Sequence, residues 1–232
     1  MSDLERDELT WLDGDMPYSQ RFGDHFYSRA DGRAECGHVF MGGNGLPERW
    51  TEGGDFTIGE LGFGTGLNFL ETWRRWRECR KPGATLDFVS FEAFPMEGEA
   101  IGRALAHWPE LEDLAKTFLH RWPALTSTPR RWEMDGQTGL TVIVGDALDG
   151  VCGWDGMANA WYLDGFAPSK NPDMWSADLM QAVADKTKPS GTFASYTAAG
   201  WVRRNLQAAG FSVEKRPGHA GKREMICGVK TG

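Results

Sequence analysis

The spacing of hydrophobic positions along the 232-residue chain changes near Phe56. From there on, short apolar runs alternate with stretches in which apolar residues recur every three or four positions, as on one face of a helix. Leu67, Leu70, Trp73 and Trp76 show this helical spacing. The pattern predicts strands at 56–61, 85–91, 159–163 and 192–196, and helices at 67–80, 96–107, 109–121, 176–187 and 199–209.

Two further pairs of apolar runs are joined by short connections. Residues 130–144 have the pattern of a hairpin, and only Pro217 to Lys222 separate the runs 211–216 and 223–229. Strands separated by helices pair in parallel with helices on both sheet faces, whereas a short connection forces antiparallel pairing. The expected fold is therefore α/β and Rossmann-like, with a mostly parallel sheet and a final antiparallel strand. This combination favours the class I methyltransferase architecture over the dinucleotide-binding one.

The first 55 residues have a different composition, rich in Gly, Asp and aromatic residues. Turn signals at Asp13-Gly14, Asp31-Gly32 and 42–45 predict short strands and loops folded over a larger core. A length of 232 residues fits one α/β domain. We therefore expect one domain, with residues 1–55 as a strand and loop extension and residues 56–232 as the core.

Composition and charge exclude several classes of protein. No apolar run approaches the ~18 residues of a membrane span, and the N-terminus does not resemble a signal peptide, so we expect a cytoplasmic protein. The four cysteines and five histidines lack ligand spacing, so we expect neither a metal site nor disulfides. The net charge is −8, yet seven basic residues stand against two acidic ones from residue 201 onward. A basic surface and ordinary solvated charges explain that excess equally well.

The strongest local feature is ELGFGTGLN, from Glu60 to Asn68, in which glycines alternate between a predicted strand and a predicted helix. Glycines let a backbone approach a ligand closely, and the free N–H groups of a helix start suit a carboxylate or phosphate. The spacing is GxGxG rather than the GxGxxG of the dinucleotide fingerprint. The loop predicts a nucleotide-like cofactor, and a structural turn is the alternative.

Acidic residues follow the successive predicted strands, where open α/β sheets bind their ligands. Glu92 could accept from ribose hydroxyls and Asp146 from an adenine amino group, while Glu60 could meet the ammonium of a methionine moiety. Asp164 follows the fourth strand in LDGFAPSKNP, where it could orient an amine and accept its proton. Taken without context, Asp164 fits slightly better as the cap of the next helix in a Pro-bounded turn.

These motifs together resemble the methyltransferase domain of the MnmC family. The matching motifs are GGNGLPERW, ELGFGTGLNFLETW, FEAFP, HWPEL, GDA, WYLDGFAPSKNPDMW, SYTAAGWVRRNLQAAGF and KREMICG, and they extend from about Pro17 to Val229. By this resemblance the chain is expected to be an S-adenosylmethionine-dependent tRNA methyltransferase. The expected reaction methylates the amine of 5-aminomethyl-2-thiouridine at the tRNA wobble position, giving 5-methylaminomethyl-2-thiouridine.

The resemblance also implies roles for individual residues. Gly62, Gly64 and Gly66 match the cofactor loop, Glu92 the ribose acid, Asp146 the adenine-side acid and Asp164 the catalytic acid near the amine. We expect Glu60, Phe63, Thr65, Asn68 and Ala147 to contact the cofactor as well, and Phe166, Lys170, Arg203, Arg204, Lys222 and Arg223 to contact the tRNA. The segment GDHFYS departs from the family pattern, so the resemblance assigns no role to Asp24, Phe26 or Tyr27.

Many members of this family are fused to a flavin-dependent domain that acts on the same nitrogen. The chain ends at Gly232, directly after the predicted methyltransferase core, which fits a standalone enzyme or one part of a fused protein. The partners expected are therefore tRNA with a modified wobble uridine and a flavin-dependent oxidase domain in cis or in trans. We expect a monomer.

Two other classes of protein fit parts of the sequence. An NAD(P)-linked oxidoreductase shares a glycine loop and an acid after the second strand, but the loop spacing differs and no His, Lys or Tyr grouping for hydride transfer is evident. A non-catalytic RNA-binding module would explain the basic C-terminal residues. It would leave the glycine loop, Glu92, Asp146 and Asp164 without a role.

Overall fold

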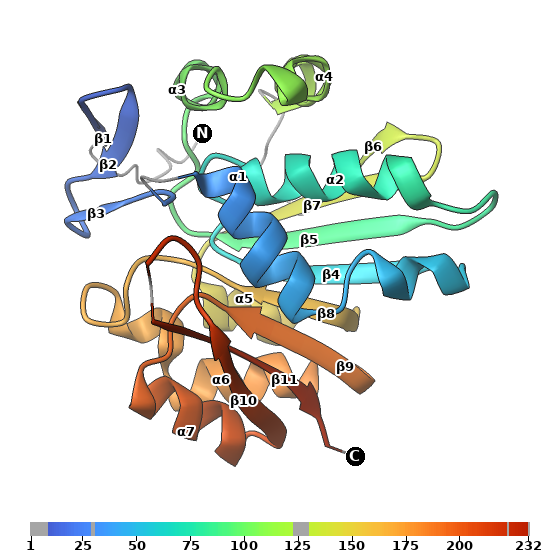
Figure 1. The fold of residues 1–232 in the computed structure, drawn as a ribbon, viewed down its shortest axis with the longest axis vertical. Helices are drawn as coiled ribbons and strands as arrows, with labels where there is room; N and C mark the ends of the chain where they lie inside the picture. Colours follow the sequence, from blue (N-terminus) through green and yellow to red (C-terminus); the bar gives the residue numbers. More distant parts are fainter. Residues whose placement is uncertain (1–8, 29–30, 123–129, 222, 232) are drawn as a thin grey trace.

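A twisted sheet forms the centre of the molecule (Figure 1). The computed structural model describes residues 9–28, 31–122, 130–221 and 223–231, and within them the sheet has eight strands in the order β10-β11-β9-β8-β4-β5-β7-β6. Its strands are β4 (Phe56–Leu61), β5 (Leu86–Glu92), β6 (Arg131–Asp135), β7 (Thr138–Val144), β8 (Ala158–Leu163), β9 (Thr187–Ser195), β10 (Phe211–Pro217) and β11 (Glu224–Lys230).

The pairing of these strands confirms the expected fold class. Strands β7, β5, β4, β8 and β9 pair in parallel, and β11 pairs antiparallel with both β9 and β10. Strand β6 forms the expected antiparallel hairpin with β7. Because the parallel strands run in one direction, the residues after β4, β5, β7 and β8 meet at one edge of the sheet.

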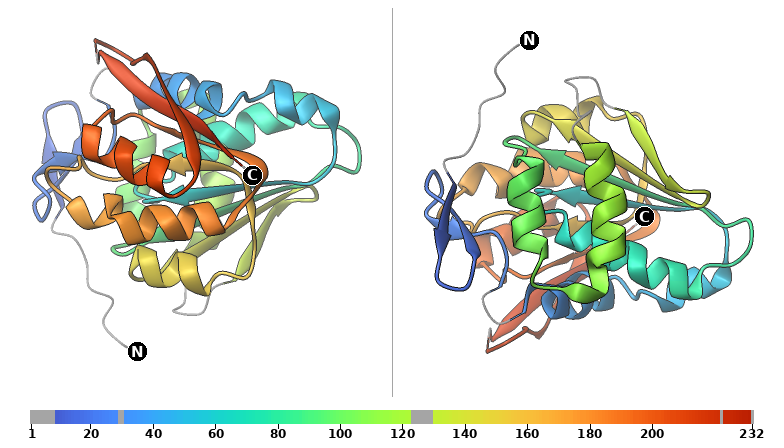
Figure 2. Two further views of the ribbon diagram at one scale, coloured as in Figure 1. Left: turned by 90° about the horizontal axis from the view of Figure 1, so that it is seen from below. Right: turned by 90° about the horizontal axis from the view of Figure 1, so that it is seen from above.

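Helices cover both faces of the sheet (Figures 1 and 2). The helices are α1 (Gly32–Glu35), α2 (Leu67–Cys79), α3 (Gly98–Leu105), α4 (Glu112–Arg121), α5 (Ala147–Gly153), α6 (Ala177–Asp185) and α7 (Gly200–Ala208). Successive residues of a strand point to opposite faces, so Tyr162 lies in one hydrophobic cluster with Phe69 of α2, and Trp161 lies in the other with Leu179 of α6. The two clusters hold the two helical layers on the sheet.

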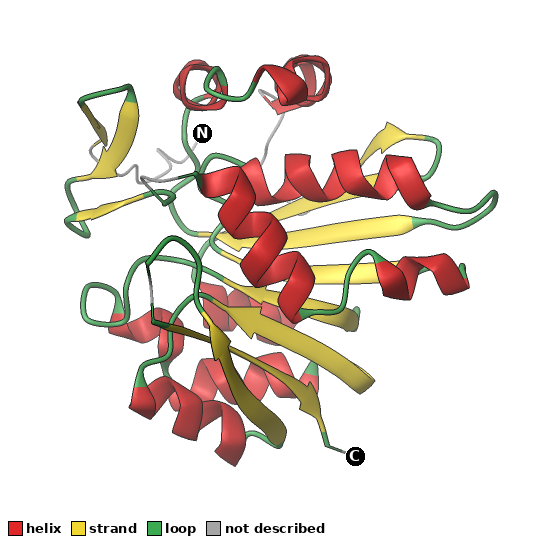
Figure 3. Cartoon of the chain, in the orientation of Figure 1, coloured by secondary structure: helices red, strands yellow, loops and turns green. Residues whose placement is uncertain are grey.

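The segment from residue 32 to residue 52 contradicts the expectation of strands and loops. Helix α1 continues into the π-helix η1 (Cys36–Met41), and the 3-10 helix η2 (Glu48–Glu52) follows (Figure 3). The side chain of Asp31, expected in a turn, caps α1 by accepting from the backbone N–H groups of Arg33 and Ala34. Phe40 and Trp50 are buried in the same hydrophobic cluster as Phe69 and Tyr162, so this segment forms part of the core.

Short strands do occur before this helical segment. Strands β1 (Leu9–Leu12), β2 (Met16–Ser19) and β3 (Asp24–His25) form a small separate antiparallel sheet. Two further elements differ from the sequence prediction. Helix α5 was not predicted, and β9 begins at Thr187 rather than at residue 192. Within the described residues, no helix is both long and apolar enough to cross a membrane.

Candidate active site

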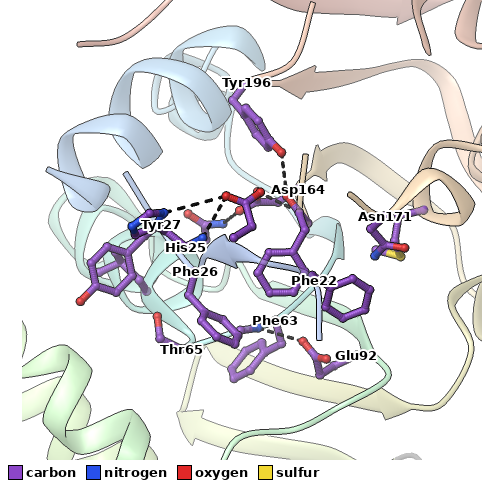
Figure 4. A pocket seen from close by; sticks show the side chains of 18 of the residues that line it. Phe22, His25, Phe26, Tyr27, Phe63, Thr65, Glu92, Asp164, Asn171 and Tyr196 are labelled. Carbon is purple, nitrogen blue, oxygen red and sulfur yellow. Dashed lines mark hydrogen bonds and ion pairs between the residues drawn. The ribbon is translucent and has the colours of Figure 1, made fainter. Parts of the chain in front are cut away.

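A cavity of about 390 Å³ opens at the sheet edge where β4, β5, β7 and β8 end. Figure 4 shows that side chains from the N-terminal part of the chain reach the same cavity as Glu92 and Asp164. Its lining includes the glycine loop, the residues after β5 and β8, and residues 22–28, which we call the N-terminal segment. The lining residues that carry the argument below are Phe22, Asp24, Phe26, Gly62, Gly64, Thr65, Asn68, Glu92, Phe94, Ala147, Asp164, Phe166 and Tyr196.

The glycine loop has the geometry that its sequence predicts. Gly62, Gly64 and Gly66 have φ values of +80°, +53° and +74°, in the left-handed region that favours glycine. A Cβ atom on Gly62 would lie 3.3 Å from the Cα of Gly165, so the loop packs directly against the segment after β8. Phe63 also lines the cavity, and its buried ring stacks on Trp122 with 5.1 Å between the ring centroids.

Glu92 connects the end of β5 to this loop. Its Oε2 accepts from the backbone N–H of Gly64 at 2.9 Å, and its Oε1 accepts from the backbone N–H of Phe94 at 2.8 Å. The carboxylate lines the cavity next to the loop. Phe94 comes two residues later in FEAFP and lines the same wall.

Glu60 does not line the cavity. Its side chain is 0% exposed, and its carboxyl group accepts from Ser90 Oγ at 2.7 Å and from Asn68 Nδ2 at 3.1 Å. Burial raises the pKa of Glu60 well above its usual range, and the hydrogen bonds from Ser90 and Asn68 act against that rise. The geometry therefore does not support the expected direct contact between Glu60 and a cofactor ammonium.

Asp146 also lies apart from the cavity. Its exposed side chain caps α5 by accepting from the backbone N–H of Asp149 at 3.0 Å. The cavity wall here is instead formed by the next residue, Ala147. The acid stands at the end of β7 as expected, but its side chain stabilises the helix start that follows.

Asp164 lies in the cavity wall directly after β8. Its Oδ2 accepts from Asn68 Nδ2 at 2.8 Å, and its Oδ1 accepts from the backbone N–H of Gly165 at 2.8 Å. The alternative of a helix cap is wrong, because Asn171 stands at the N-cap of the next helix, the 3-10 helix η5 (Pro172–Trp175), and Ser176 stands at the N-cap of α6. The structure thus leaves Asp164 in a position to meet a ligand.

Aromatic rings surround the segment after Asp164. Phe166 stacks on Phe22 with 4.7 Å between ring centroids and meets Phe26 edge-on at 5.1 Å. Asp24 ties the N-terminal segment to the same loop, since its Oδ2 accepts from the backbone N–H of Ala167 at 2.9 Å. The N-terminal segment thereby completes the wall of the cavity beside Asp164.

Tyr196 lines the cavity at the end of β9 and donates to the carbonyl of Gly165 at 2.8 Å. Burial raises the pKa of Tyr196 well above its usual range, and the charges of Asp164, Asp24 and Glu35 raise it further. The sequence argument missed Tyr196 although the rule that strand ends bind ligands applies to the predicted strand 192–196. Phe22 and Asp24 had no such signal, because they reach the cavity only through long-range packing.

Four of the basic residues expected to contact tRNA lie outside the cavity lining, namely Lys170, Arg203, Arg204 and Arg223. Arg203 and Arg204 are on α7, where Arg204 is exposed and Arg203 is half-buried, and Lys170 and Arg223 are exposed. Lys222 lies outside the described residues. Two neighbouring cations are paired with acids: Lys215 Nζ lies 2.7 Å from Glu224, and Arg216 contacts Glu214.

Comparison with known proteins agrees with this geometry and with the resemblance seen in the sequence. Proteins named tRNA 5-methylaminomethyl-2-thiouridine biosynthesis bifunctional protein MnmC are 45% identical in Chromohalobacter salexigens, over 95% of this chain, and 44% identical in Pseudomonas paraeruginosa, over 100% of it. The matched regions cover 32% and 36% of those relatives, so the chain spans about a third of their length.

Solved structures show the same fold. MNMC2 from Aquifex aeolicus superposes with a TM-score of 0.78 at 22% identity, over 98% of this chain and 71% of that chain. Precorrin-6y C5,15-methyltransferase from Geobacter metallireducens GS-15 gives a TM-score of 0.53 at 13% identity, over 96% of this chain and 100% of that one. At these identities the structural matches establish the fold and no more.

A match to a family profile indicates the class of enzyme. The profile described as S-adenosyl-L-methionine-dependent methyltransferase matches residues 109–231, which is more than half of the chain. It includes the loop after β8 with Asp164, the end of β9 with Tyr196, and helix α7. The chain therefore belongs to this family of S-adenosyl-L-methionine-dependent methyltransferases.

Proposed function

We propose that the protein methylates the amine of 5-aminomethyl-2-thiouridine at the wobble position of tRNA, forming 5-methylaminomethyl-2-thiouridine. The observation that carries this proposal is one cavity that joins the glycine loop and Glu92 to Asp164 and the aromatic wall of Phe166. A methyl donor and a nucleoside amine must meet in such a space. The names of the relatives supply the substrate class.

The residues present fit S-adenosylmethionine. Positive φ values at Gly62 and Gly64 bring backbone close to the cavity, and a volume of about 390 Å³ lies in the range of ligand pockets. Gly62 to Gly66 would hold the methionine end, Glu92 the ribose hydroxyls, and Ala147 with Phe94 the adenine. When bound, the cofactor supplies an electrophilic methyl group on its sulfonium.

Asp164 is the proposed catalytic residue. The substrate is a primary alkylamine, which is mostly protonated at neutral pH, and an ammonium has no lone pair for displacement. The site must therefore favour the neutral amine. The Asp164 carboxylate would accept an N–H hydrogen bond, hold the nitrogen in line for attack, and take the proton.

The rings of Phe166, Phe22 and Phe26 form the proposed surface for the modified base. Aromatic side chains commonly stack on an unstacked nucleobase. The wobble base would leave the anticodon stack and enter the cavity, as in other enzymes that act on a base. These rings would also keep water away from Asp164.

The tRNA backbone would dock beside the cavity mouth. Helix α7 starts after β9, at the same sheet edge as the cavity, and carries Arg203 and Arg204 in its first turns. Exposed Lys170 lies in the loop after Asp164, and Arg223 precedes β11. Phosphate contacts from such side chains supply most sequence-independent affinity for nucleic acid.

We further propose that the enzyme acts in the cytoplasm as a monomer. A flavin-dependent oxidase domain, in cis or in trans, would supply the amine by removing a carboxymethyl group from the same nitrogen. The proposed division of the chain is a methyltransferase core from residue 56 and an extension before it that contributes to the cavity.

Two measurements test the proposed function. Calorimetric titration should give binding of S-adenosylmethionine and no binding of NADH. Incubation with tRNA and S-adenosylmethionine labelled on its methyl group should move the label to tRNA that carries 5-aminomethyl-2-thiouridine. Absence of transfer to such tRNA, with cofactor binding intact, would contradict the proposed substrate.

A further inference from the structure

Asn68 connects two acids that differ in their surroundings. Its side-chain nitrogen donates to Asp164 Oδ2 at 2.8 Å and to Glu60 Oε1 at 3.1 Å. The other oxygen of Glu60 accepts from Ser90 Oγ at 2.7 Å. A chain of hydrogen bonds thus runs from β5 through β4 and the first turn of α2 to the residue after β8.

The geometry of this chain fixes the direction of the Asn68 amide. A primary amide nitrogen has two hydrogens, and here each hydrogen has an acid oxygen as its partner. Glu60 is 0% exposed, so the hydrogen bond between them holds Asn68 from the core side. The remaining hydrogen is thereby aimed at Asp164.

The position of Asn68 in the chain adds a second constraint. It lies two residues after Gly66, at the start of α2, and lines the same cavity as the glycine loop. A helix restricts side-chain rotamers, so the amide has little freedom to turn away. Asn68 therefore joins the loop proposed for the cofactor to the acid proposed for the substrate amine.

We infer that Asn68 is a positioning residue for methyl transfer, which holds the Asp164 carboxylate toward the substrate amine through an amide anchored on buried Glu60. This inference rests on the catalytic role proposed above for Asp164. It also gives Glu60 a function other than direct contact with the cofactor. Burial favours the neutral form of Glu60, and an acid that acts by accepting a hydrogen bond needs no charge.

Other titratable groups surround Asp164 and would act on the same carboxylate. They are Glu60 from β4, Cys36 from η1 and Tyr196 at the end of β9, and Asp24 and Glu35 act on that tyrosine. Asn68 donates to Asp164 and carries no charge, so removing this donor should change the proton affinity of Asp164 without adding or removing a charge.

The first test is Asn68→Ala, measured in single turnovers with saturating tRNA and S-adenosylmethionine. Removal of one hydrogen bond to a charged group should lower the rate roughly 10- to 100-fold. The acidic limb of the rate profile should move to higher pH, because a carboxylate without this donor binds a proton more readily. Affinity for S-adenosylmethionine should stay close to that of the wild type.

The matched control is Thr72→Val. Thr72 lies one turn further along α2, is buried, and shares a hydrogen bond of 3.1 Å with Tyr162, away from the cavity. This substitution should lower the melting temperature and leave the rate profile unchanged. If the acidic limb shifts in Asn68→Ala and not in Thr72→Val, the shift comes from the lost positioning of Asp164 and not from a general decrease in stability.

Glu60 provides a second, independent pair of variants. Glu60→Leu removes the anchor of Asn68 and should lower the rate, while Glu60→Gln keeps an acceptor and should retain most of the wild-type rate. Both should retain cofactor affinity. If Glu60→Gln instead weakens binding of S-adenosylmethionine as strongly as Glu60→Leu, Glu60 acts as a charged cofactor ligand and the inference is overturned.

A measurement that needs no tRNA separates this inference from the proposed function. Protein labelled with ¹³C at the aspartate carboxyl carbons can be titrated by NMR, and the Asp164 signal can be assigned from its absence in Asp164→Asn. Asn68→Ala should move that titration to higher pH even if no tRNA is methylated. An unchanged titration would overturn the positioning role, whereas a shifted titration without methyl transfer would contradict only the proposed function.

Discussion

Asp164 is the residue at which the separate parts of the site meet. It follows β8, accepts from the amide of Asn68, and precedes the loop that packs against Gly62 and the N-terminal segment. Its carboxylate lies beside an aromatic wall rather than in open solvent. These contacts give it fixed surroundings, which a group that orients an amine requires.

Replacing Asp164 by Asn tests its role as a proton acceptor. The variant should fold and bind S-adenosylmethionine, because the amide has the same shape, but turnover should fall by about 10²-fold or more. Part of the activity should return at higher pH, where more of the substrate amine is neutral. The measurement is single-turnover rate against pH, with exposed Asp178→Asn on α6 as the control. Near wild-type turnover in Asp164→Asn at neutral pH would mean that another group accepts the proton.

Gly64→Val tests the cofactor loop. Gly64 has a φ of +53°, and a Cβ there would lie 3.4 Å from Cδ1 of Phe26, on the cavity wall. A branched side chain should crowd the loop and abolish cofactor binding, measured by calorimetry, while the circular dichroism spectrum persists. The control is Gly83→Val, which has a similar φ of +81° with nothing within 4 Å. Wild-type affinity in Gly64→Val would remove the loop from the site.

At this scale the sequence predicted which residues end strands better than where their side chains point. The glycine loop, Glu92 and Asp164 lie in the cavity as expected, since strand ends of a parallel sheet share an edge. Glu60 precedes the loop but turns into the core toward Ser90, and Asp146 turns to cap α5. Side-chain direction depends on neighbours from other elements, and one sequence does not identify those neighbours.

Among the elements, the long periodic helices and buried strands were predictable, and the helical segment from residue 32 to residue 52 was not. Its apolar residues, among them Val39 and Phe40, are outnumbered by glycines and polar residues, so its periodicity is weak. Phe40 stacks on Tyr162 of β8, with 5.3 Å between the ring centroids. Long-range packing of this kind overrides weak local propensity. Helix α5 escaped prediction similarly, because two of its seven residues are glycine.

The prediction about tRNA binding concerns two basic residues of helix α7. Changing Arg203 and Arg204 together to Glu should weaken tRNA binding and flatten its salt dependence, by roughly 0.7–0.9 log units per log unit of salt for each phosphate that is no longer neutralised. The measurement is tRNA affinity by filter binding across a series of salt concentrations. The control is Arg77→Glu with Lys81→Glu. It makes the same charge change at the C-terminal end of α2, which lies at the opposite edge of the sheet from the cavity. An unchanged slope in the α7 variant would put the RNA on another face.

For the whole molecule, the net charge of −8 contrasts with the polyanionic substrate that we propose. The charges are unevenly distributed, with six acids and one Arg in the first 15 residues and a basic excess after residue 201. Lys215 and Arg216 pair with acids of the C-terminal hairpin, which reduces their availability for phosphate. Local basic groups at the cavity edge, rather than the net charge, would therefore decide where RNA binds.

Buried Glu60 should also affect the stability of the whole fold. Burial raises its pKa, so above the ordinary carboxyl range the native state holds a proton that the unfolded chain releases. The free energy of unfolding of the wild type should therefore fall as pH rises, by up to about 1.4 kcal/mol per pH unit for this one group.

Glu60→Gln isolates this effect, because glutamine carries no titratable proton. The difference in unfolding free energy between the variant and the wild type should grow in favour of the variant as the pH rises above the ordinary carboxyl range. Urea unfolding at several pH values, followed by tryptophan fluorescence, measures it. A constant difference above that range would mean that Glu60 titrates as an exposed carboxyl group does.

The central claim is methyl transfer to the amine at the tRNA wobble position. Its most direct test is mass spectrometry of nucleosides from tRNA bearing 5-aminomethyl-2-thiouridine, after incubation with the protein and S-adenosylmethionine carrying a deuterated methyl group. We predict that 5-aminomethyl-2-thiouridine disappears and 5-methylaminomethyl-2-thiouridine with the deuterated methyl group appears. Omission of S-adenosylmethionine should prevent this conversion, and the change Asp164→Asn should slow it by about 10²-fold or more at neutral pH. Unchanged 5-aminomethyl-2-thiouridine, or label on a different nucleoside, would contradict the claim.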